Sequence, residues 1–334
     1  MGKRECVLDA IRHKGTGIVP YNVELTSEEL AKVSDFLGIE KAGFFDWAGN
    51  YIEKCSCNFG GGYVKPDFYK DEFGVLWDRS GIDKDIGICD IQIPEPNLNN
   101  YTFPEPDLKA IEESIEKLVN NGRDTFKLAK IGLAYFERAW SLAGMENLLM
   151  NFLLEPDFCK ELLEKILEYN LKIIETVCEY DIDGVYLGDD YGQQTGLIMS
   201  PQTWREFIKP GLATMFDTAK KRGKIVALHS CGDISNILSD LIDIGLDVYQ
   251  TVQPEVYDLK KLKAEYGADL AFWGCISTQR LLPYATPAEL KNVVNETIAI
   301  MSEGGGFIAA PTHQVPADVP AENILALVEL LRGE

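Results

Sequence analysis

The segment KIVALHSCGDISNILSDLIDI, residues 224–244, contains a short apolar run, a polar loop and an amphipathic stretch. The run 224–228 predicts a buried strand, and the apolar spacing over 234–244 predicts a helix. A strand that leads into a helix is the repeating unit of parallel α/β folds. If the chain repeats this unit, the segment decides the fold class.

The alternation of short apolar runs and amphipathic stretches becomes regular from about Leu108 onwards. Besides 224–228, the predicted strands are 126–133, 184–188, 247–251, 270–274 and 306–310, with 17–21 as an earlier member. The predicted helices are 156–180, 201–221, 234–244, 259–266, 287–301 and 321–331. Seven strands, with an eighth expected near residues 42–60, predict a (β/α)8 TIM-like barrel. A doubly wound open sheet is the alternative, which periodicity does not exclude.

The first part of the chain is less regular than the rest. Residues 1–107 contain the first predicted strand and an irregular segment rich in Gly, Pro and aromatic residues, which we interpret as a covering subdomain. Residues 108–334 contain the main part of the predicted barrel. In both candidate folds functional residues gather at the carboxyl ends of the strands.

Charge and composition narrow the range of partners. The 334 residues include 53 acidic and 32 basic ones, a net charge of −21, which argues against nucleic acid, an anionic membrane or a polyanionic substrate. No apolar run approaches the roughly 20 residues that a membrane span needs, and no secretory signal opens the chain. We therefore expect a cytoplasmic enzyme with reduced thiols that acts on a small molecule.

Two of the three histidines follow predicted strands. His229 ends the run 224–228 and is followed by Ser230 and Cys231, and His313 comes after the run 306–310. In an extended chain residues i and i+2 point to one side, so His229 and Cys231 can direct nitrogen and sulfur at one ion. These donors suit zinc, whose catalytic sites keep one position open. The third ligand is predicted to be His313 or Cys275, which ends another strand.

Carboxylates follow other predicted strands. Asp189 and Asp190 end the strand 184–188, and Glu24 follows the strand 17–21. All three are candidates for acid–base catalysis, and Glu24 and Asp189 are also candidates for the metal shell. Because adjacent residues of an extended chain point in opposite directions, the alternative is that one aspartate caps a helix or turn while the other is solvated.

A substrate site needs an apolar lining with a few convergent polar groups. Candidates for this lining occur near the same predicted strand ends, and we expect them to contact the substrate: Tyr21, Asn22, Phe136, Tyr186, Tyr191 and Trp273.

The stretch 183–331 resembles the uroporphyrinogen decarboxylase-like superfamily, in particular its branch of corrinoid- and thiol-dependent methyltransferases. The motifs that carry the resemblance are Gly188-Asp189-Asp190, the segment 200–210, His229-Ser230-Cys231-Gly232, Phe272-Trp273-Gly274, Thr286-Pro287-Ala288-Glu289 and Ala310-Pro311-Thr312-His313, with a weaker match at 71–77. The resemblance implies a distorted (β/α)8 barrel and a zinc ion held by the His-x-Cys pair and a later cysteine. His313 stands at the place of that later cysteine. The start of the chain lacks the arginine-rich stretch of true uroporphyrinogen decarboxylases, so tetrapyrrole decarboxylation is not expected.

The resemblance leads us to expect a zinc-dependent methyltransferase that moves a methyl group between a small methylated compound and the cobalt of a separate corrinoid protein. A methoxylated aromatic or a methylamine is favoured as the methyl donor. The alternatives are a methylcorrinoid:thiol methyltransferase, a metal-free decarboxylase or lyase that uses Asp189 or Asp190, and a non-enzymatic binding subunit with a closed structural metal site.

Overall fold

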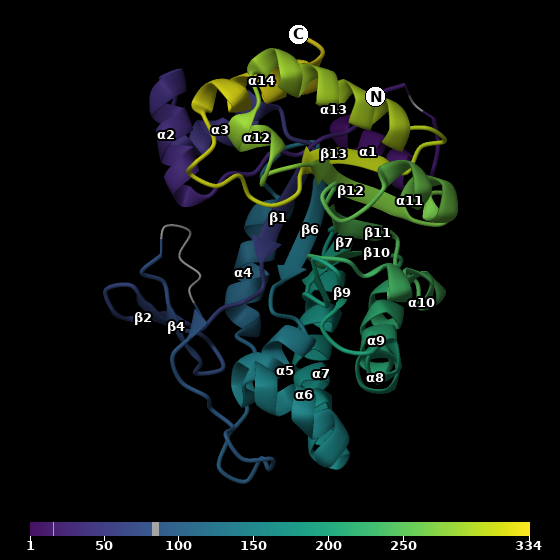
Figure 1. Ribbon diagram of the computed structural model, residues 1–334. Helices are drawn as coiled ribbons and strands as arrows, with labels where there is room; N and C mark the ends of the chain where they lie inside the picture. The colour runs from purple at the N-terminus through teal and green to yellow at the C-terminus, as the bar shows by residue number, and fades with distance from the viewer. Residues whose placement is uncertain (16, 82–86) are drawn as a thin grey trace. The chain divides into compact units, whose positions relative to one another are not determined.

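The computed structural model describes residues 1–15, 17–81 and 87–334 (Figure 1). The chain divides into two compact units, each of which is built from separate stretches of sequence. Unit 1 consists of Met1–Glu53, Arg123–Phe126 and Asp247–Glu334, and unit 2 consists of Lys54–Gly122 and Lys127–Leu246.

Unit 2 contains the parallel strands that carry the candidate site. They are β6 (Phe126–Ile131) from its second residue onwards, β7 (Gly184–Gly188), β10 (Ile225–His229) and, beside β6, the carboxyl half of β1 (Ile52–Ser56). The register pairs Lys130 with Tyr186 between β6 and β7, and Gly188 with His229 between β7 and β10. Their carboxyl ends therefore lie along one edge of the sheet.

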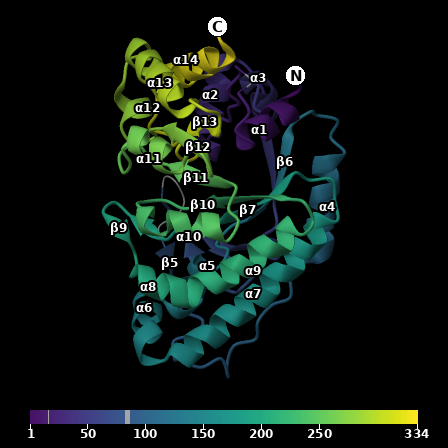
Figure 2. The ribbon, with the colours of Figure 1, turned by 90° about the vertical axis from the view of Figure 1, so that its right-hand side faces the viewer.

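The helices of unit 2 are amphipathic, and the longest of them is α7 (Pro156–Cys178). Its buried residues recur at helical spacing, and it packs against α9 (Lys209–Lys220), as Figure 2 shows. Ahead of α9 the chain forms the short α8 (Pro201–Thr203) and a π-helical turn, η2 (Trp204–Ile208). The other helices of this unit are α4 (Leu108–Val119), α5 (Phe136–Ala143), α6 (Met145–Leu154), η3 (Ser235–Ile237) and α10 (Leu238–Asp243).

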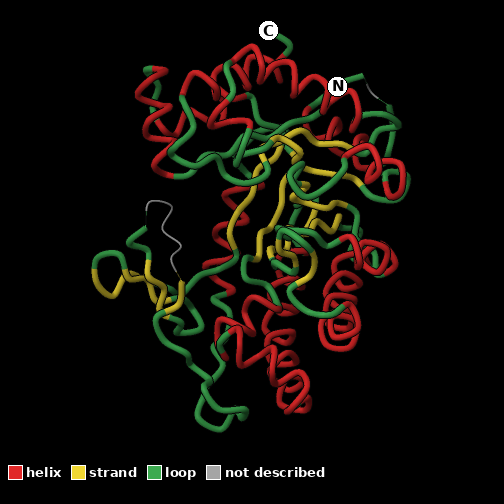
Figure 3. Tube along the Cα trace, in the orientation of Figure 1, coloured by secondary structure: helices red, strands yellow, loops and turns green. Residues whose placement is uncertain are grey.

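Short antiparallel strands in unit 2 form two small separate sheets (Figure 3). The first contains β2 (Gly62–Lys65), β3 (Phe68–Lys70), β4 (Leu76–Asp78) and β5 (Gly87–Ile88). The second pairs β8 (Gly192–Gln193) with β9 (Gly196–Leu197). The first sheet belongs to the segment predicted to be an irregular covering subdomain.

Unit 1 contains the parallel strands β11 (Val248–Val252), β12 (Ala271–Ile276) and β13 (Phe307–Pro311), with β12 paired to both others. Their side chains are buried along their whole length, as in a parallel sheet that is covered on both faces. The helices are α1 (Lys3–Ile11), α2 (Ser27–Leu37), η1 (Lys41–Gly43), α3 (Phe44–Ala48), α11 (Leu259–Tyr266), α12 (Leu281–Tyr284), α13 (Pro287–Met301) and α14 (Ala321–Arg332).

The predicted α/β barrel class is confirmed, with seven parallel-sheet strands in the described residues where eight were expected. The eighth strand sought near 42–60 is β1, whereas the prediction of a strand over 17–21 is wrong. Within residues 17–21, only Tyr21 pairs with another segment, in an isolated parallel β-bridge to Ala309. Pro20 has no N–H to donate, and its carbonyl instead accepts from Ala309 N.

No helix in the described part of the chain is both long and apolar enough to cross a lipid bilayer.

Candidate functional site

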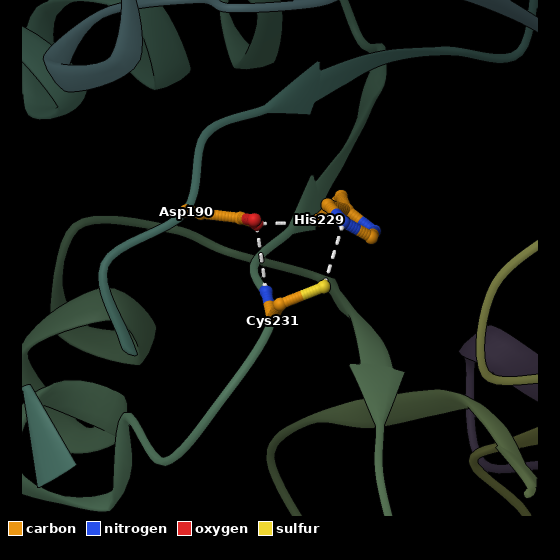
Figure 4. Close-up of side chains that lie close together, drawn as sticks. All are labelled: Asp190, His229 and Cys231. Atoms are coloured by element: carbon orange, nitrogen blue, oxygen red, sulfur yellow. Dashed lines mark hydrogen bonds and ion pairs between the residues drawn. The ribbon is translucent and has the colours of Figure 1, made fainter. Parts of the chain in front are cut away.

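Three potential metal-binding side chains meet at the carboxyl ends of β7 and β10 in unit 2: Asp190, His229 and Cys231 (Figure 4). Their ligand atoms all lie within 4.8 Å of one another. His229 Nε2 is 3.4 Å from Cys231 Sγ and 3.4 Å from Asp190 Oδ1. The predicted convergence of His229 and Cys231 is thus present, and Asp190 is the third member of the group.

Three hydrogen bonds join the two segments that hold these residues, 189–191 and 229–231. Asp189 N donates to His229 O at 3.0 Å, and Tyr191 N donates to Ser230 Oγ at 2.9 Å. In the opposite direction, Cys231 N donates to Asp190 Oδ1 at 2.8 Å. These bonds place the Asp190 carboxylate beside the imidazole and the thiol.

Two glycines allow the loops to approach this closely. A Cβ atom on Gly192 would lie 2.7 Å from the carbonyl oxygen of Cys231. Gly232 has φ +76°, and a Cβ atom there would lie 2.3 Å from the carbonyl carbon of Gly192. A side chain at either position would push the loops apart, so glycine is required at both.

The spacing of the donors fits a zinc ion. Zinc ligands at about 2.0–2.1 Å for nitrogen or oxygen and about 2.3 Å for sulfur, arranged as a tetrahedron, lie about 3.4–3.6 Å from one another. The separations of 3.4 Å from His229 Nε2 to Cys231 Sγ and to Asp190 Oδ1 agree with this arrangement. One nitrogen, one sulfur and one carboxylate oxygen would leave the fourth position open for substrate, water or a further protein ligand.

Electrostatics at the site favour a cation. Burial, together with the carboxylates of Asp190 and Glu137, raises the pKa of the Cys231 thiol. Burial and the charges of Asp190 and Asp189 likewise raise the pKa of Glu137. A bound divalent cation reverses this effect, because it stabilises the thiolate and offsets the clustered negative charge.

Asp189, a predicted acid–base residue, is fully buried and accepts three hydrogen bonds. Its donors are Phe136 N at 2.8 Å, Glu137 N at 2.7 Å and Tyr191 Oη at 2.5 Å. Burial raises the pKa of Asp189 to about 6, opposed by these bonds. Asp189 thus anchors the first turn of α5, while the side chain of its neighbour Asp190 points the other way, towards His229 and Cys231, as expected for adjacent residues of an extended chain.

Aromatic residues predicted to line the site have different surroundings in unit 2. Tyr186 lies edge-on to His229, with ring centroids 6.5 Å apart. Phe136 and Tyr191 are fully buried, and Tyr191 packs edge-on against Trp204 with centroids 5.9 Å apart. Of these three, Tyr186 has the ring contact with the metal-binding group, and substrate contact by all three stays a prediction.

The other predicted site residues lie in unit 1. Cys275 is buried on β12 with φ +72°, and burial raises the pKa of its thiol. His313 is exposed after β13. Of the remaining residues, Asn22 Nδ2 donates to Glu24 Oε1 at 2.9 Å, and Tyr21 and Trp273 are buried. Their predicted roles as ligands, catalytic groups or substrate contacts stay predictions.

Sequence reasoning missed a buried ion pair next to the site. Arg138, on α5, forms ion pairs with Asp71 at 2.6 Å and Glu72 at 3.0 Å, and its side chain is 2% exposed. Its guanidinium also stacks 4.1 Å from the ring centroid of Phe73. Asp71 and Glu72 both lie in the motif at 71–77, but nothing in the local sequence pattern indicates a cationic partner at least 66 residues away.

Two lysines near the Tyr186 ring were also missed. Lys54 Nζ lies 5.1 Å and Lys130 Nζ 6.0 Å from the centroid of the Tyr186 ring. The signal was present in the sequence, because strand β6 reads FKLAKI where a buried parallel strand is usually a continuous apolar run.

Comparisons with known proteins identify the family of the chain and its fold. The family model described as uroporphyrinogen decarboxylase (URO-D) matches residues 92–333. Two curated proteins named methylcobamide:CoM methyltransferase MtaA, from Methanosarcina barkeri and its strain Fusaro, are 26% and 24% identical over 174 residues. That alignment covers 52% of this chain and 48% of each relative, so the chain spans about half the length of these proteins. A solved methyltransferase from Methanosarcina mazei has the same fold, with a TM-score of 0.78 at 18% identity, covering 100% of this chain and 99% of that one.

Proposed function

The chain belongs to the uroporphyrinogen decarboxylase (URO-D) family, and we propose that it is a zinc-dependent methyltransferase within that family. The observation that carries the proposal is the group formed by Asp190, His229 and Cys231 at the strand ends. The similarity to proteins named methyltransferases supports it. The methyl group would move between a small methylated compound and the cobalt of a separate corrinoid protein.

In this proposal His229 Nε2, Cys231 Sγ and Asp190 Oδ1 hold the metal. Zinc supplies a Lewis acid that stabilises negative charge on the heteroatom bearing or receiving the methyl group. Cys231 binds as the thiolate, and the hydrogen bond from its own amide to Asp190 keeps the carboxylate in place. His313 and Cys275 remain the proposed candidates for a further ligand.

Two directions of transfer are compatible with this site. Demethylation of a methoxylated aromatic or a methylamine is our first proposal, because the Tyr186 ring lies beside His229. The second is transfer from a methylcorrinoid to a thiol, which the name of the Methanosarcina barkeri relatives favours. In both directions the cobalt would belong to a partner protein, and we propose that the enzyme works in the cytoplasm.

The first test is the zinc content of untagged wild type and of Cys231→Ala, measured by elemental analysis after identical purification. We expect about one zinc per chain in the wild type and loss of zinc in the variant. Asp190→Asn is expected to lower the zinc affinity. The matched control is Cys89→Ala, which removes an exposed cysteine that lies outside the group and is expected to retain zinc.

A folded wild type that takes up no zinc when zinc is offered would overturn the proposal. Full activity after chelation would instead support the metal-free decarboxylase or lyase that uses Asp189 or Asp190. Zinc uptake that depends on Cys231 would justify assays of methylated compounds with cob(I)alamin.

A further inference from the structure

Two cysteine side chains meet at the end of β1 in unit 2. Cys55 lies on this strand, and Cys57 follows directly after its last residue. Because residues two apart on an extended chain point to the same side, both thiols leave the same face of the strand. The two thiols are hydrogen-bonded to each other. They form a dithiol pair that is separate from the proposed metal-binding group.

The two thiols differ in their access to solvent. Cys55 is 9% exposed and Cys57 is 1% exposed. Cys57 N donates to Lys130 O at 2.8 Å, which holds the backbone of Cys57 against β6. The Cys55 thiol lies 3.9 Å from Leu128 O, to which it donates, and it is also hydrogen-bonded to the Ser114 hydroxyl on α4. A small oxidant from solvent therefore reaches Cys55 first.

The hydrogen bonds also divide the chemistry between the two sulfurs. The bond from the Cys57 thiol lowers the pKa of Cys55, while burial opposes this effect and the Ser114 hydroxyl adds to it. The same thiol–thiol bond, together with burial, raises the pKa of Cys57. Cys55 thus forms a thiolate more readily, whereas Cys57 keeps its proton. An attacking thiol and a resolving thiol have this relation.

Strand geometry permits a bond between the two sulfurs. A rise of about 3.2–3.4 Å per residue places Cα atoms two residues apart at about 6.4–6.8 Å. This separation is at the upper end of the range of about 4.4–6.8 Å that disulfides usually span. A disulfide between Cys55 and Cys57 can therefore close, and because its geometry lies at the limit it should be easily reduced again.

We propose that Cys55 and Cys57 form a redox-active dithiol that closes reversibly to a disulfide by exchange with a low-molecular-weight disulfide. The Cys55 thiolate attacks one sulfur of the oxidant, whose S–S bond breaks and releases one thiolate. Cys57 then loses its proton and attacks Cys55 Sγ, which releases the second thiolate. Two protein thiols are thereby oxidised, and one small disulfide is reduced to two thiols. This inference goes beyond the proposed function and does not depend on it.

Asn58 connects the dithiol to neighbouring segments of unit 2. Asn58 Oδ1 accepts from Gly132 N at 2.8 Å, and Asn58 Nδ2 donates to Gly132 O at 3.1 Å and to Glu72 Oε1 at 2.9 Å. Glu72 is in turn paired with Arg138 on α5. Closing the disulfide bends the chain directly before Asn58, so we expect oxidation to weaken these contacts and to lower the melting temperature.

The test exposes the folded full chain to mixtures of reduced and oxidised glutathione. Acid stops the exchange, free thiols are blocked with N-ethylmaleimide in urea, and tryptic peptides are mapped by mass spectrometry. Cleavage after Lys54 and Lys70 gives the peptide 55–70, which contains Cys55 and Cys57 and no other cysteine. We expect this peptide to become two hydrogen atoms lighter than its dithiol form and to take up no N-ethylmaleimide. Dithiothreitol should restore the dithiol.

Other cysteines of unit 2 serve as internal controls. Cys89 is exposed, so its modification shows that the oxidant is active. Cys178, on α7, is buried, and burial raises the pKa of its thiol to about 11, so it should stay reduced.

Variants separate the roles of the two thiols. Cys57→Ser removes the resolving thiol, so Cys55 is expected to accumulate as the mixed disulfide with glutathione, which the wild type should not do. Cys55→Ser is expected to leave Cys57 unmodified. The matched control Cys178→Ser should leave the yield of the disulfide in the peptide 55–70 unchanged. A melting temperature for each reduced variant confirms that it is folded.

The possible results decide the proposal. A peptide 55–70 that stays a dithiol in the folded wild type while Cys89 is modified overturns it, whatever the variants do. A disulfide that forms only in urea also overturns it, because the folded chain would then not bring the sulfurs together. Equal amounts of mixed disulfide in the wild type and in Cys57→Ser would contradict the resolving role of Cys57. An unchanged melting temperature after full oxidation would contradict the connection through Asn58.

Discussion

At the scale of single residues, Asp189 connects the metal-binding loop to α5. Its carboxylate is fully buried and accepts hydrogen bonds from two backbone amides and the Tyr191 hydroxyl. Asp189→Ala leaves all three donors unsatisfied, so we expect the free energy of unfolding to fall by about 3 kcal/mol or more. Urea denaturation measures this loss.

Tyr191→Phe provides a graded comparison, because it removes one of the three bonds and keeps the ring packed on Trp204. We expect a loss of about 1–2 kcal/mol. If Asp189→Ala and Tyr191→Phe lowered the free energy of unfolding equally, the assignment of Asp189 as the common acceptor of these hydrogen bonds would be contradicted.

Arg138 stabilises the fold through charge rather than apolar contact. Because its guanidinium is buried between Asp71 and Glu72, Arg138→Met leaves two carboxylates buried without their cation. We expect the free energy of unfolding to fall by about 3–5 kcal/mol. Arg138→Lys should restore only part of this stability, since an ammonium group cannot bond both carboxylates in the planar geometry of a guanidinium.

The control for Arg138 is an exposed ion pair in the same unit. Lys172 Nζ bonds Glu105 at 2.5 Å, and the two side chains are 47% and 76% exposed. Lys172→Met is expected to cost less than about 1 kcal/mol, because water and salt screen exposed pairs. If Arg138→Met and Lys172→Met lowered the free energy of unfolding by similar amounts, burial would not be the reason for the strength of the Arg138 ion pairs.

At the scale of elements, α13 begins with a complete capping box. Thr286 Oγ1 accepts from Glu289 N, and Glu289 Oε2 accepts from Thr286 N at 2.9 Å. Thr286→Ala is expected to lower the free energy of unfolding by about 1 kcal/mol, whereas Thr286→Ser, which keeps the hydroxyl, should remain close to wild type. Equal destabilisation by both substitutions would exclude the cap as the cause.

The cap also predicts a pH dependence. The hydrogen bonds from the Thr286 amide and hydroxyl hold the pKa of Glu289 below its ordinary value of 4.5. A carboxyl with a lowered folded-state pKa contributes stability above its unfolded pKa, and that contribution disappears as pH falls through the folded value. The stability difference between wild type and Thr286→Ala should therefore shrink as pH falls below about 4.5, in urea titrations at several pH values.

At the scale of the whole molecule, a net charge of −21 produces repulsion that opposes folding. We expect the urea midpoint at pH 7 to rise as KCl increases from about 10 mM to about 200 mM, because the Debye length falls from about 30 Å to below 10 Å. A midpoint that does not move or that falls with salt would mean that local ion pairs outweigh the general repulsion.

The elements were predictable because their signals are local. The strand 184–188 and the helices 259–266 and 287–301 have the predicted bounds, and the other parallel strands from β6 onwards differ by only a few residues at their ends, whereas the short antiparallel strands β8 and β9 were not predicted. The exception is 17–21, where pairing limited to one residue replaces the predicted strand. The helix predicted over 201–221 is present but includes a π-helical turn, which apolar spacing alone does not indicate.

The sequence by itself determined the α/β class, the order of the parallel strands from β6 onwards, and the meeting of His229 with Cys231, because a two-residue spacing on an extended chain is fixed by local backbone geometry. Only the tertiary structure decided that Asp190 joins this pair, that Asp189 turns away to anchor α5, and that Lys130 faces Tyr186. It likewise decided that Arg138 pairs with Asp71 across 67 positions of the chain. These contacts depend on the register between neighbouring strands and on how loops and helices pack, and a shift of one residue in strand register would turn the side chains of that strand to the opposite face.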